Sequence, residues 1–310
     1  MPLMRTFFLA LSRSERLREM AVSLAPARKL SRRFVAGETL DEAIAVVRSL
    51  DGQGLLATLD HLGENVTSET EARDATLEVL DLLDAVKAAG LRSGVSVKLT
   101  QLGLDLHPSL AVENLERIVA HAAAADRFVR IDMESFDYVQ PTLDLFEELW
   151  ERYRNVGVVI QSYLYRSDED VARLVRMGAS VRLVKGAYDE PPEVAYADKE
   201  DTDASYVRLM ERLFGDEAQS NGVYPAIATH DTNLIDWAVE HTRSRGIPRD
   251  RFEFQMLYGI RSGLQRQLVA KGYRMRAYVP YGERWYPYFM RRLAERPANV
   301  LFLMRNLLRG

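Results

Sequence analysis

Two adjacent arginines near the end of the chain have the chemistry to bind a carboxylate. Arg291 and Arg292 occur in "RWYPYFMRRLAER" (284–296), where helical spacing places Tyr288 and Glu295 on the same side as the pair. Two guanidinium groups side by side can hold one carboxylate through charge-assisted hydrogen bonds. Taken alone, such a helix is more typical of a solvated surface, so the groups opposite it decide its role.

A lysine and an aspartate stand at the ends of two apolar runs earlier in the chain. Lys98 lies in "VSVKL" (95–99), and Asp132 ends "FVRID" (128–132). On neighbouring parallel strands the two side chains would pair, and each would limit the cost of burying the other. The pair is either structural or the anchor for a zwitterionic or anionic substrate.

Two further motifs indicate ligand contacts. In "RLVKGAY" (182–188), Arg182 and Lys185 have the charge to meet phosphates or the edge of a flavin ring, and Gly186 would allow close backbone approach. In "ATHDTN" (228–233), Thr229 and His230 either contact a ligand or stand beside a simple helix cap. The chain's five histidines are scattered and lack H-E-x-x-H spacing, so we expect no metal site.

Eight short, β-branched runs alternate with helix-like stretches and would position these residues. Strands that alternate with helices pair in parallel, so eight units predict an α/β fold of the (β/α)₈ barrel type. A doubly wound sheet is the alternative, but its G-x-G-x-x-G phosphate turn does not occur in the sequence. The runs span residues 55–60, 95–99, 128–132, 156–161, 180–184, 225–229, 252–256 and 275–279.

Hydrogen-bonding or charged side chains end nearly every run. Barrel enzymes place their chemistry at the carboxyl ends of the strands, so this ring predicts a functional mouth. The arginine pair follows the eighth run and could reach over that mouth, with Glu64 as its partner when no substrate is bound. The ring comprises Asp60, Lys98, Asp132, Gln161, Arg182 with Lys185, Thr229 with His230, Gln255 and Tyr278.

We expect a single domain over residues 1–310. It would consist of a helical segment (1–50, with Thr39 as a helix cap), the barrel (51–296) and a helical tail (297–310). A charged insertion, "PEVAYADKEDTDASY" (192–206), would separate the fifth strand from its helix and act as a lid or cofactor contact.

Composition excludes several classes of protein. A net charge of −4 argues against a nucleic-acid binder, and a chain without cysteine has neither disulfides nor thiolate chemistry. No apolar run approaches the roughly 18 residues of a membrane span, and the N-terminus lacks a secretory signal, so we expect a cytoplasmic protein. The terminal "VLFLMRNLLRG" either packs on the domain or lies peripherally on a membrane surface.

These segments together resemble proline dehydrogenase, the flavoenzyme of the first step of proline breakdown. The resemblance runs from about residue 55 to 296 in the expected order. It implies a distorted (β/α)₈ barrel that binds FAD non-covalently. The matching motifs are "VSVKL", "IDME", "VVIQSYLYR", "VRLVKGAY", "ATHD", "FEFQMLYG", "RAYVPYG" and "YFMRRLAE".

Carried onto this chain, the resemblance implies two sets of contacts. Arg291, Arg292 and Lys98 would hold the carboxylate of L-proline, and Asp132, Tyr278, Tyr288, Leu257 and Ala187 would shape the ring pocket. Asp132 and Arg182 would be catalytic. Asp132 would orient Lys98, and Arg182 would lie near the flavin N5. The residues expected to contact FAD are Met133, Gln161, Arg182, Val184, Lys185, Gly186, Ala187, Lys199, Thr229, His230 and Glu295.

The implied reaction is hydride transfer from C5 of proline to the flavin, which gives Δ1-pyrroline-5-carboxylate, followed by reoxidation of the flavin by a quinone. Bifunctional relatives carry an aldehyde dehydrogenase with a cysteine thiolate, which this cysteine-free chain lacks, so a separate pyrroline-5-carboxylate dehydrogenase would take the product. Two rival interpretations remain: a Schiff-base lyase or aldolase using Lys98 or Lys185, and a non-catalytic binding protein for an amino acid carboxylate.

Overall fold

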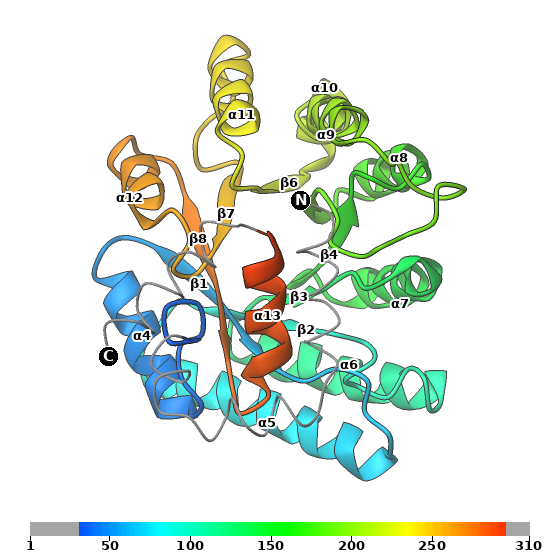
Figure 1. Cartoon of the computed structure of the whole chain (residues 1–310), viewed down its shortest axis with the longest axis vertical. Helices are drawn as coiled ribbons and strands as arrows, with labels where there is room; N and C mark the ends of the chain where they lie inside the picture. The colour runs from blue at the N-terminus through cyan, green and yellow to red at the C-terminus, as the bar shows by residue number, and fades with distance from the viewer. Residues whose placement is uncertain (1–30, 296–310) are drawn as a thin grey trace.

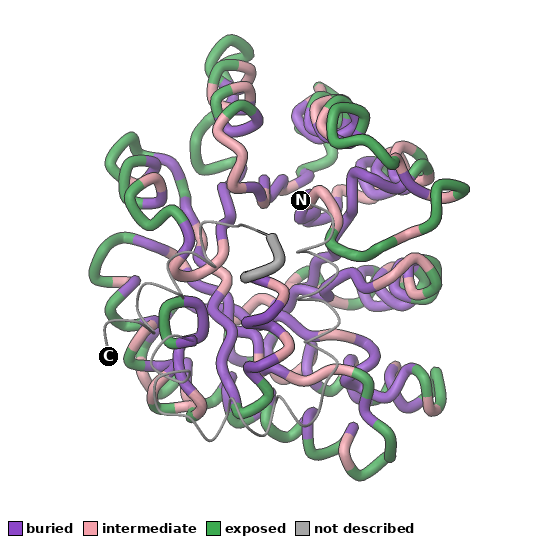
Figure 2. Tube along the Cα trace, viewed as in Figure 1, coloured by how far each residue is buried: buried purple, intermediate pink, exposed green. Residues whose placement is uncertain are grey.

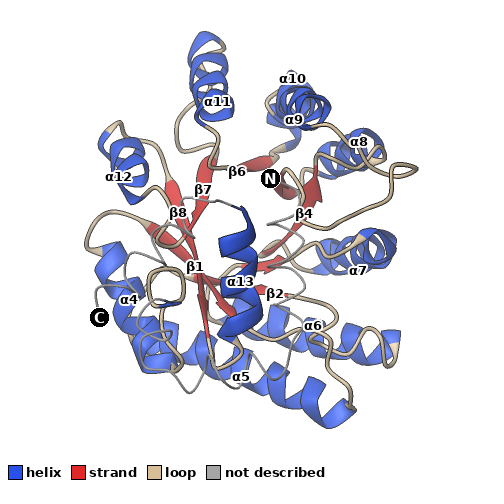
Figure 3. Ribbon diagram, in the orientation of Figure 1, coloured by secondary structure: helices blue, strands red, loops and turns tan. Residues whose placement is uncertain are grey.

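The eight expected strands close into one parallel barrel, which confirms the predicted fold class. The computed structural model describes residues 31–295, with side chains to Arg292. Each strand pairs with the next in sequence, and β8 pairs with β1 (Figures 1 and 3). The strands are β1 (Leu56–His61), β2 (Gly94–Val97), β3 (Val129–Ile131), β4 (Val156–Gln161), β5 (Ser180–Val184), β6 (Tyr224–Ala228), β7 (Glu253–Leu257) and β8 (Met275–Tyr281).

Helices surround the ring of strands (Figure 3). None of the helices within residues 31–295 combines the length and apolar character needed to cross a membrane. They are α4 (Leu40–Asp51), α5 (Glu69–Ala88), α6 (Pro108–Ala124), the 3₁₀ turn η1 (Phe136–Tyr138), α7 (Val139–Arg152), α8 (Ser167–Met177), α9 (Lys199–Leu213), α10 (Asp216–Asn221), α11 (Thr232–Ser244), α12 (Ser262–Ala270) and α13 (Trp285–Glu295).

Helix α13 departs from the regular barrel pattern. It lies across the ring of strands rather than beside β8 (Figure 1), and α4 packs against β1 and β8 in the place that the last helix of a regular barrel takes. Trp285 seats α13 by donating from Nε1 to Glu38 Oε1 at 3.0 Å and by packing on Phe289, 5.9 Å between ring centroids. The distortion brings the arginine-bearing helix over the barrel.

The segment before β1 is helical in only part of its described length, residues 31–55. Residues 32–39 form turns and bends, and α4 begins after Thr39, whose capping box with Glu42 confirms the predicted cap. The remainder of the expected N-terminal segment and the tail at 297–310 lie outside the described residues.

The structure corrects the expected extent of the charged insertion. Its second half, from Lys199, belongs to α9, so the connection after β5 spans residues 185–198. That connection is held by an isolated antiparallel bridge between Leu164 and Ala195. The insertion is therefore shorter than its charge pattern suggested, because the helix starts inside the charged stretch.

The apolar core lies between the strands and the surrounding helices. Much of the barrel's trace is coloured as buried (Figure 2). The outward-facing Val95, Val97, Val129 and Ile131 are fully buried in this core. Polar side chains occupy the inside of the barrel instead, where branched aliphatic residues usually form layers. The inward-facing polar and charged positions include Ser96, Arg130, Asp132, Ser180, Arg182, Glu253, Gln255, Arg276 and Tyr278.

Gly94 tests how closely β2 and β3 approach. A Cβ on Gly94 would lie 2.4 Å from the carbonyl oxygen of Phe128, so Gly94→Ala should lower the free energy of unfolding by about 1–3 kcal/mol through overpacking. Gly263→Ala is the matched control, because no atom from beyond its own turn of α12 lies within 4 Å of its Cβ position and the residue is helical. Urea unfolding should show that variant unchanged or up to about 1 kcal/mol more stable; equal losses in both variants would contradict the argument.

Candidate active site

Lys98 is buried at the mouth of the barrel between two carboxylates. Its Nζ donates to both oxygens of Asp60, at 3.0 and 3.1 Å, and to Asp132 Oδ2 at 3.3 Å. The contact with Asp132 confirms the predicted pairing of Lys98 and Asp132. Burial lowers the pKa of Lys98, but Asp60 and Asp132 outweigh that effect and raise it above its ordinary value. Lys98 is therefore a fixed cation.

Asp132 joins three elements at the mouth. It accepts hydrogen bonds from Arg182 Nη1 on β5 at 2.7 Å and from the Tyr278 hydroxyl on β8 at 2.8 Å, besides that from Lys98. Burial raises the pKa of Asp132, but the charges of Lys98 and Arg182 and the hydrogen bond from Tyr278 lower it overall. Asp132 is thus held ionised while it fixes the side chains around it.

Arg182 spans the barrel below the mouth. Its Nη2 donates to Ser96 Oγ on β2 at 3.2 Å, and its guanidinium lies 5.4 Å from the centre of the Tyr278 ring. The Nε atom is buried and has no hydrogen-bond partner within residues 31–295. A buried donor left over beside an ionised carboxylate fits the binding of an acceptor group at this position.

Helix α13 presents its arginines to the mouth. Arg291 Nη1 donates to Glu64 Oε1 at 2.7 Å, which confirms the predicted pair. Burial raises the pKa of Glu64, but Arg291 and then Lys98 outweigh it and lower the pKa, so Glu64 lies within electrostatic reach of both cations. Arg292 is only 9% exposed, and its guanidinium lies 4.9 Å from the centre of the Tyr288 ring. A solvated surface face is therefore excluded.

A second charged cluster lies on the rim after β5 and β6. Lys185 Nζ donates to Asp231 Oδ2 at 2.9 Å and also pairs with Asp203, which Lys199 contacts as well. Asp231 caps α11 by accepting from Asn233 N at 3.1 Å, so the simple cap considered for this motif is present. Lys199 is 72% exposed in its side chain. The rim cluster is separate from the buried ion pairs.

His230 and Gly186 have structural contacts of their own. His230 Nε2 accepts from Leu257 N at 3.0 Å, so its ring proton is on Nδ1 and the imidazole links β6 to β7. A Cβ on Gly186 would lie 2.3 Å from the Tyr163 ring, and φ is +119°. The glycine thus makes room for a protein ring, and the expected close approach to a ligand is not needed to explain it.

The other predicted residues surround these clusters. Gln161 Nε2 donates to the Glu134 carbonyl at 3.0 Å, and Thr229 Oγ1 accepts from Asp231 N at 3.1 Å. The side chain of Glu295 lies outside the described part of the chain. Gln255, expected at the mouth, instead hydrogen bonds to Glu253 deeper in the barrel. Met133 is buried, Val184 and Leu257 are half-buried, and Ala187 is exposed.

Sequence reasoning missed two carboxylates. Asp60 was expected only as a strand end, although its pairing with Lys98 is among the tightest contacts of the site. Glu134 is buried and accepts from Thr100 N and Oγ1 at 3.1 and 2.6 Å, and burial raises its pKa. An acidic residue two positions after Asp132 was the available signal for Glu134.

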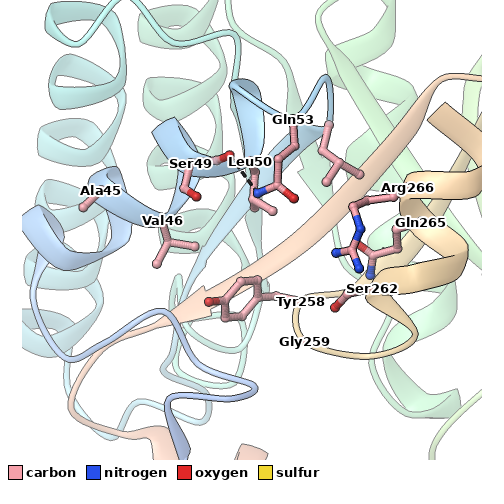
Figure 4. A pocket seen from close by; sticks show the side chains of 11 residues that line it. Ala45, Val46, Ser49, Leu50, Gln53, Tyr258, Gly259, Ser262, Gln265 and Arg266 are labelled. Atoms are coloured by element: carbon pink, nitrogen blue, oxygen red, sulfur yellow. Dashed lines mark hydrogen bonds between the residues drawn. The ribbon is translucent and has the colours of Figure 1, made fainter. Parts of the chain in front are cut away.

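A cavity of about 390 Å³ lies outside the mouth, between α4 and α12 (Figure 4). Val46, Leu50, Tyr258 and Arg266 contribute to its lining, and none of the predicted site residues does. The cavity is therefore distinct from the charged cluster at the barrel mouth.

Comparison with known proteins places this geometry in a family. The family model described as proline dehydrogenase matches residues 43–305. The chain belongs to the proline dehydrogenase family. It is 43% identical over 303 residues to proline dehydrogenase 2 of Bacillus subtilis (strain 168), with 98% of each chain covered. It is also 43% identical to proline dehydrogenase of Deinococcus radiodurans, with 91% of each covered.

Larger family members share the barrel. The bifunctional protein PutA of Klebsiella aerogenes is 30% identical over 328 residues, which cover 90% of this chain and 24% of PutA. A crystal structure of PutA from Bdellovibrio bacteriovorus inactivated by N-propargylglycine superposes with a TM-score of 0.81 at 29% identity, covering 87% of this chain and 33% of that one. The protein is accordingly an oxidoreductase that acts on proline.

The charge of Asp132 should make stability depend on pH. Its pKa is lower in the folded than in the unfolded chain, so its stabilisation is present above about pH 4 and is lost as the pH falls through the folded value. At pH 7, Asp132→Asn should cost roughly 3–5 kcal/mol because it leaves buried cations unpaired. In urea unfolding, the difference in the free energy of unfolding between Asp132→Asn and wild type should become smaller below pH 4.

Glu134→Gln is the matched control for that experiment. Burial raises the pKa of Glu134, so its ionised form costs stability at neutral pH. This variant should be at least as stable as wild type at pH 7, with the advantage vanishing below about pH 4. A pH-independent gap for Asp132→Asn would contradict the assignment.

Proposed function

We propose that the protein oxidises L-proline to Δ1-pyrroline-5-carboxylate with FAD as the hydride acceptor at N5 and a quinone as the final electron acceptor. The observation that carries the proposal is the buried Lys98–Asp132–Arg182 cluster lying beneath the arginine pair of α13. It combines fixed cations for a carboxylate with a leftover buried donor, on a chain of the proline dehydrogenase family.

The substrate carboxylate would be held by three cations. Arg291 and Arg292 come from α13, and Lys98 comes from the end of β2. Glu64, now paired with Arg291, would give up that contact to the incoming carboxylate. Tyr278, Tyr288, Leu257 and Ala187 would then border the ring of proline. Orientation of this kind can supply roughly 7–11 kcal/mol of barrier lowering in favourable cases.

The residues at β3 to β6 suit a flavin nucleotide. Arg182 has a spare buried donor for the edge of the ring, and Lys185 supplies positive charge at the rim. FAD, when bound, would supply the hydride acceptor. Other residues proposed to hold it are Met133, Gln161, Val184, Gly186, Ala187, Lys199, Thr229, His230 and Glu295.

Asp132 and Arg182 would be the catalytic pair. Asp132 fixes both Lys98 and Arg182 by direct contact, so the carboxylate site and the flavin site are set by one side chain. The positive charge of Arg182 favours negative charge that develops on a group above it. Helix α13 lies over the ring of strands (Figure 1), where it would limit the access of water to a bound substrate.

The geometry argues against a Schiff-base enzyme. A nucleophilic lysine needs a lowered pKa, whereas two carboxylates raise the pKa of Lys98. Lys185 is likewise paired with Asp203 and Asp231. Each amine is tied to two carboxylates, an arrangement that does not suit attack on a carbonyl.

Beyond the site, we propose a cytoplasmic location with peripheral access to a membrane quinone pool. The observation in favour is the apolar, arginine-bearing C-terminal sequence. A separate pyrroline-5-carboxylate dehydrogenase would consume the product.

Visible spectroscopy tests the proposed function. Protein purified and reconstituted with excess FAD should show flavin absorbance, and anaerobic L-proline should bleach it. A chain that stays colourless with excess FAD would overturn the proposal. Trapping of a carbonyl substrate on Lys98 or Lys185 with borohydride would support the Schiff-base alternative instead.

Replacing one arginine of the clamp should weaken proline binding. Arg291→Met removes a charge-assisted contact of about 1.5–3 kcal/mol, which corresponds to a KM for proline roughly 10- to 100-fold higher. Arg284→Met is the control, because Arg284 is exposed directly before α13. Steady-state kinetics should leave the control within about twofold of wild type, within the range of a surface substitution. An equal rise in both variants would argue against the clamp.

A further inference from the structure

Arg130 is a buried cation without a carboxylate partner. It lies on β3, 3% exposed, and donates from Nη1 to the carbonyls of Val158 at 2.9 Å and Ser180 at 2.7 Å. Its Nη2 donates to Ser180 Oγ at 3.0 Å. No carboxylate among the side chains described for residues 31–292 comes within ion-pair distance of it. The Nε of Arg130 has no hydrogen-bond partner within the described residues. A buried guanidinium that donates only to neutral oxygens keeps its charge uncompensated.

The strand beside Arg130 is built to admit this side chain. Arg130 pairs in register with Gly157 of β4, and a Cβ on Gly157 would lie 2.5 Å from Arg130 Nη1. The guanidinium therefore crosses β4 at the glycine and reaches β5. The Phe128 ring, 4.9 Å away at its centre, packs on the same group. The position of the charge is fixed by the strand register.

The charges inside the barrel do not cancel. Glu253 pairs with Arg276 at 2.6 and 3.0 Å, Asp132 pairs with Arg182 and Lys98, and Asp60 pairs with Lys98. Among the described inward-facing groups there are thus four cations, Arg130, Arg182, Arg276 and Lys98, for three carboxylates. Arg130 is the cation in excess.

The excess charge lies directly below the proposed catalytic pair. Arg130 precedes Asp132 by two residues on the same face of β3, about 7 Å along the strand. Burial, followed by repulsion from Arg182, lowers the pKa of Arg130, with Glu253 and Asp132 opposing that effect. A guanidinium keeps its proton at neutral pH, so Arg130 carries its charge there.

We propose that Arg130 is a positioning residue that acts through Asp132 and Arg182, and that its uncompensated charge raises the reduction potential of the flavin bound at the mouth. Glu253, in the same interior, opposes Arg130 and partly offsets its charge. A fixed charge in the poorly solvated interior acts on negative charge developing above it far more strongly than it would in water. This inference rests on the proposed function, because it requires FAD at the mouth.

Opposite charge removals give opposite predictions. In the FAD-loaded full chain, Arg130→Gln should weaken the preference for reduced over oxidised flavin roughly tenfold, which lowers the midpoint potential by about 30 mV for a two-electron couple. Glu253→Gln should raise the midpoint potential by a similar amount. Equilibration with a reference redox dye measures both values without turnover.

Two controls separate charge from packing. Arg130→Lys keeps the charge, and Ser180→Ala removes one hydrogen bond to Arg130 without changing any charge. Both should leave the potential close to that of wild type, within about threefold in the flavin preference, or about 15 mV. Thermal unfolding monitored by circular dichroism reports packing loss in each variant independently.

The outcomes are distinct. Shifts of the same sign in Arg130→Gln and Glu253→Gln, or no shift in either, overturn the inference. If Arg130→Gln does not fold, Glu253→Gln decides alone, and a potential that fails to rise overturns it. A wild-type chain that takes up no flavin overturns the proposed function as well. If proline bleaches the bound flavin but neither substitution shifts the midpoint potential, only the role of Arg130 is overturned.

Discussion

The site depends on one constraint, the burial of the Lys98 ammonium group at the mouth of the barrel. A buried cation needs carboxylates, and Asp60 and Asp132 supply them from the two neighbouring strands β1 and β3. Asp132 then has oxygen atoms left to satisfy, which Arg182 and Tyr278 occupy. Each requirement recruits a side chain from a further strand, so the polar network extends across the barrel rather than remaining local.

The inside of the barrel can be polar because the apolar core that stabilises the fold lies between the strands and the helices. Residues such as Val95, Val129 and Phe254 are fully buried in the main hydrophobic core of the chain. Alternation along each strand separates the two functions, since neighbouring residues face opposite sides of the sheet. The two members of an ion pair such as Glu253–Arg276 therefore need only satisfy each other's hydrogen-bonding groups and keep the interior side chains in position.

Sequence patterns predicted the fold well and the site partly. The β-branched runs placed the strands within one or two residues, because periodicity is local, and strand order alone brought Lys98 to Asp132. The second partner of Lys98, Asp60, depends on how β1 and β2 align, which no local pattern encodes. The ring of Tyr163 beside Gly186 comes from a different strand end, so the sequence around the glycine could not predict that contact. The start of α9 was hidden because its first turn is charged, and the buried residues that mark the helix, such as Tyr206 and Leu209, come only later.

The positions of α4 and α13 separate two roles along the chain. The wall between β8 and β1 is completed by a helix that precedes the first strand, while the helix that follows the last strand crosses the opening. Closure of the ring and recognition of what enters it are thus encoded at opposite ends of the sequence. Substitutions in α13 can therefore alter selectivity while the ring of strands stays closed. Substitutions on the outer face of α4 can alter solubility while the mouth of the barrel stays unchanged.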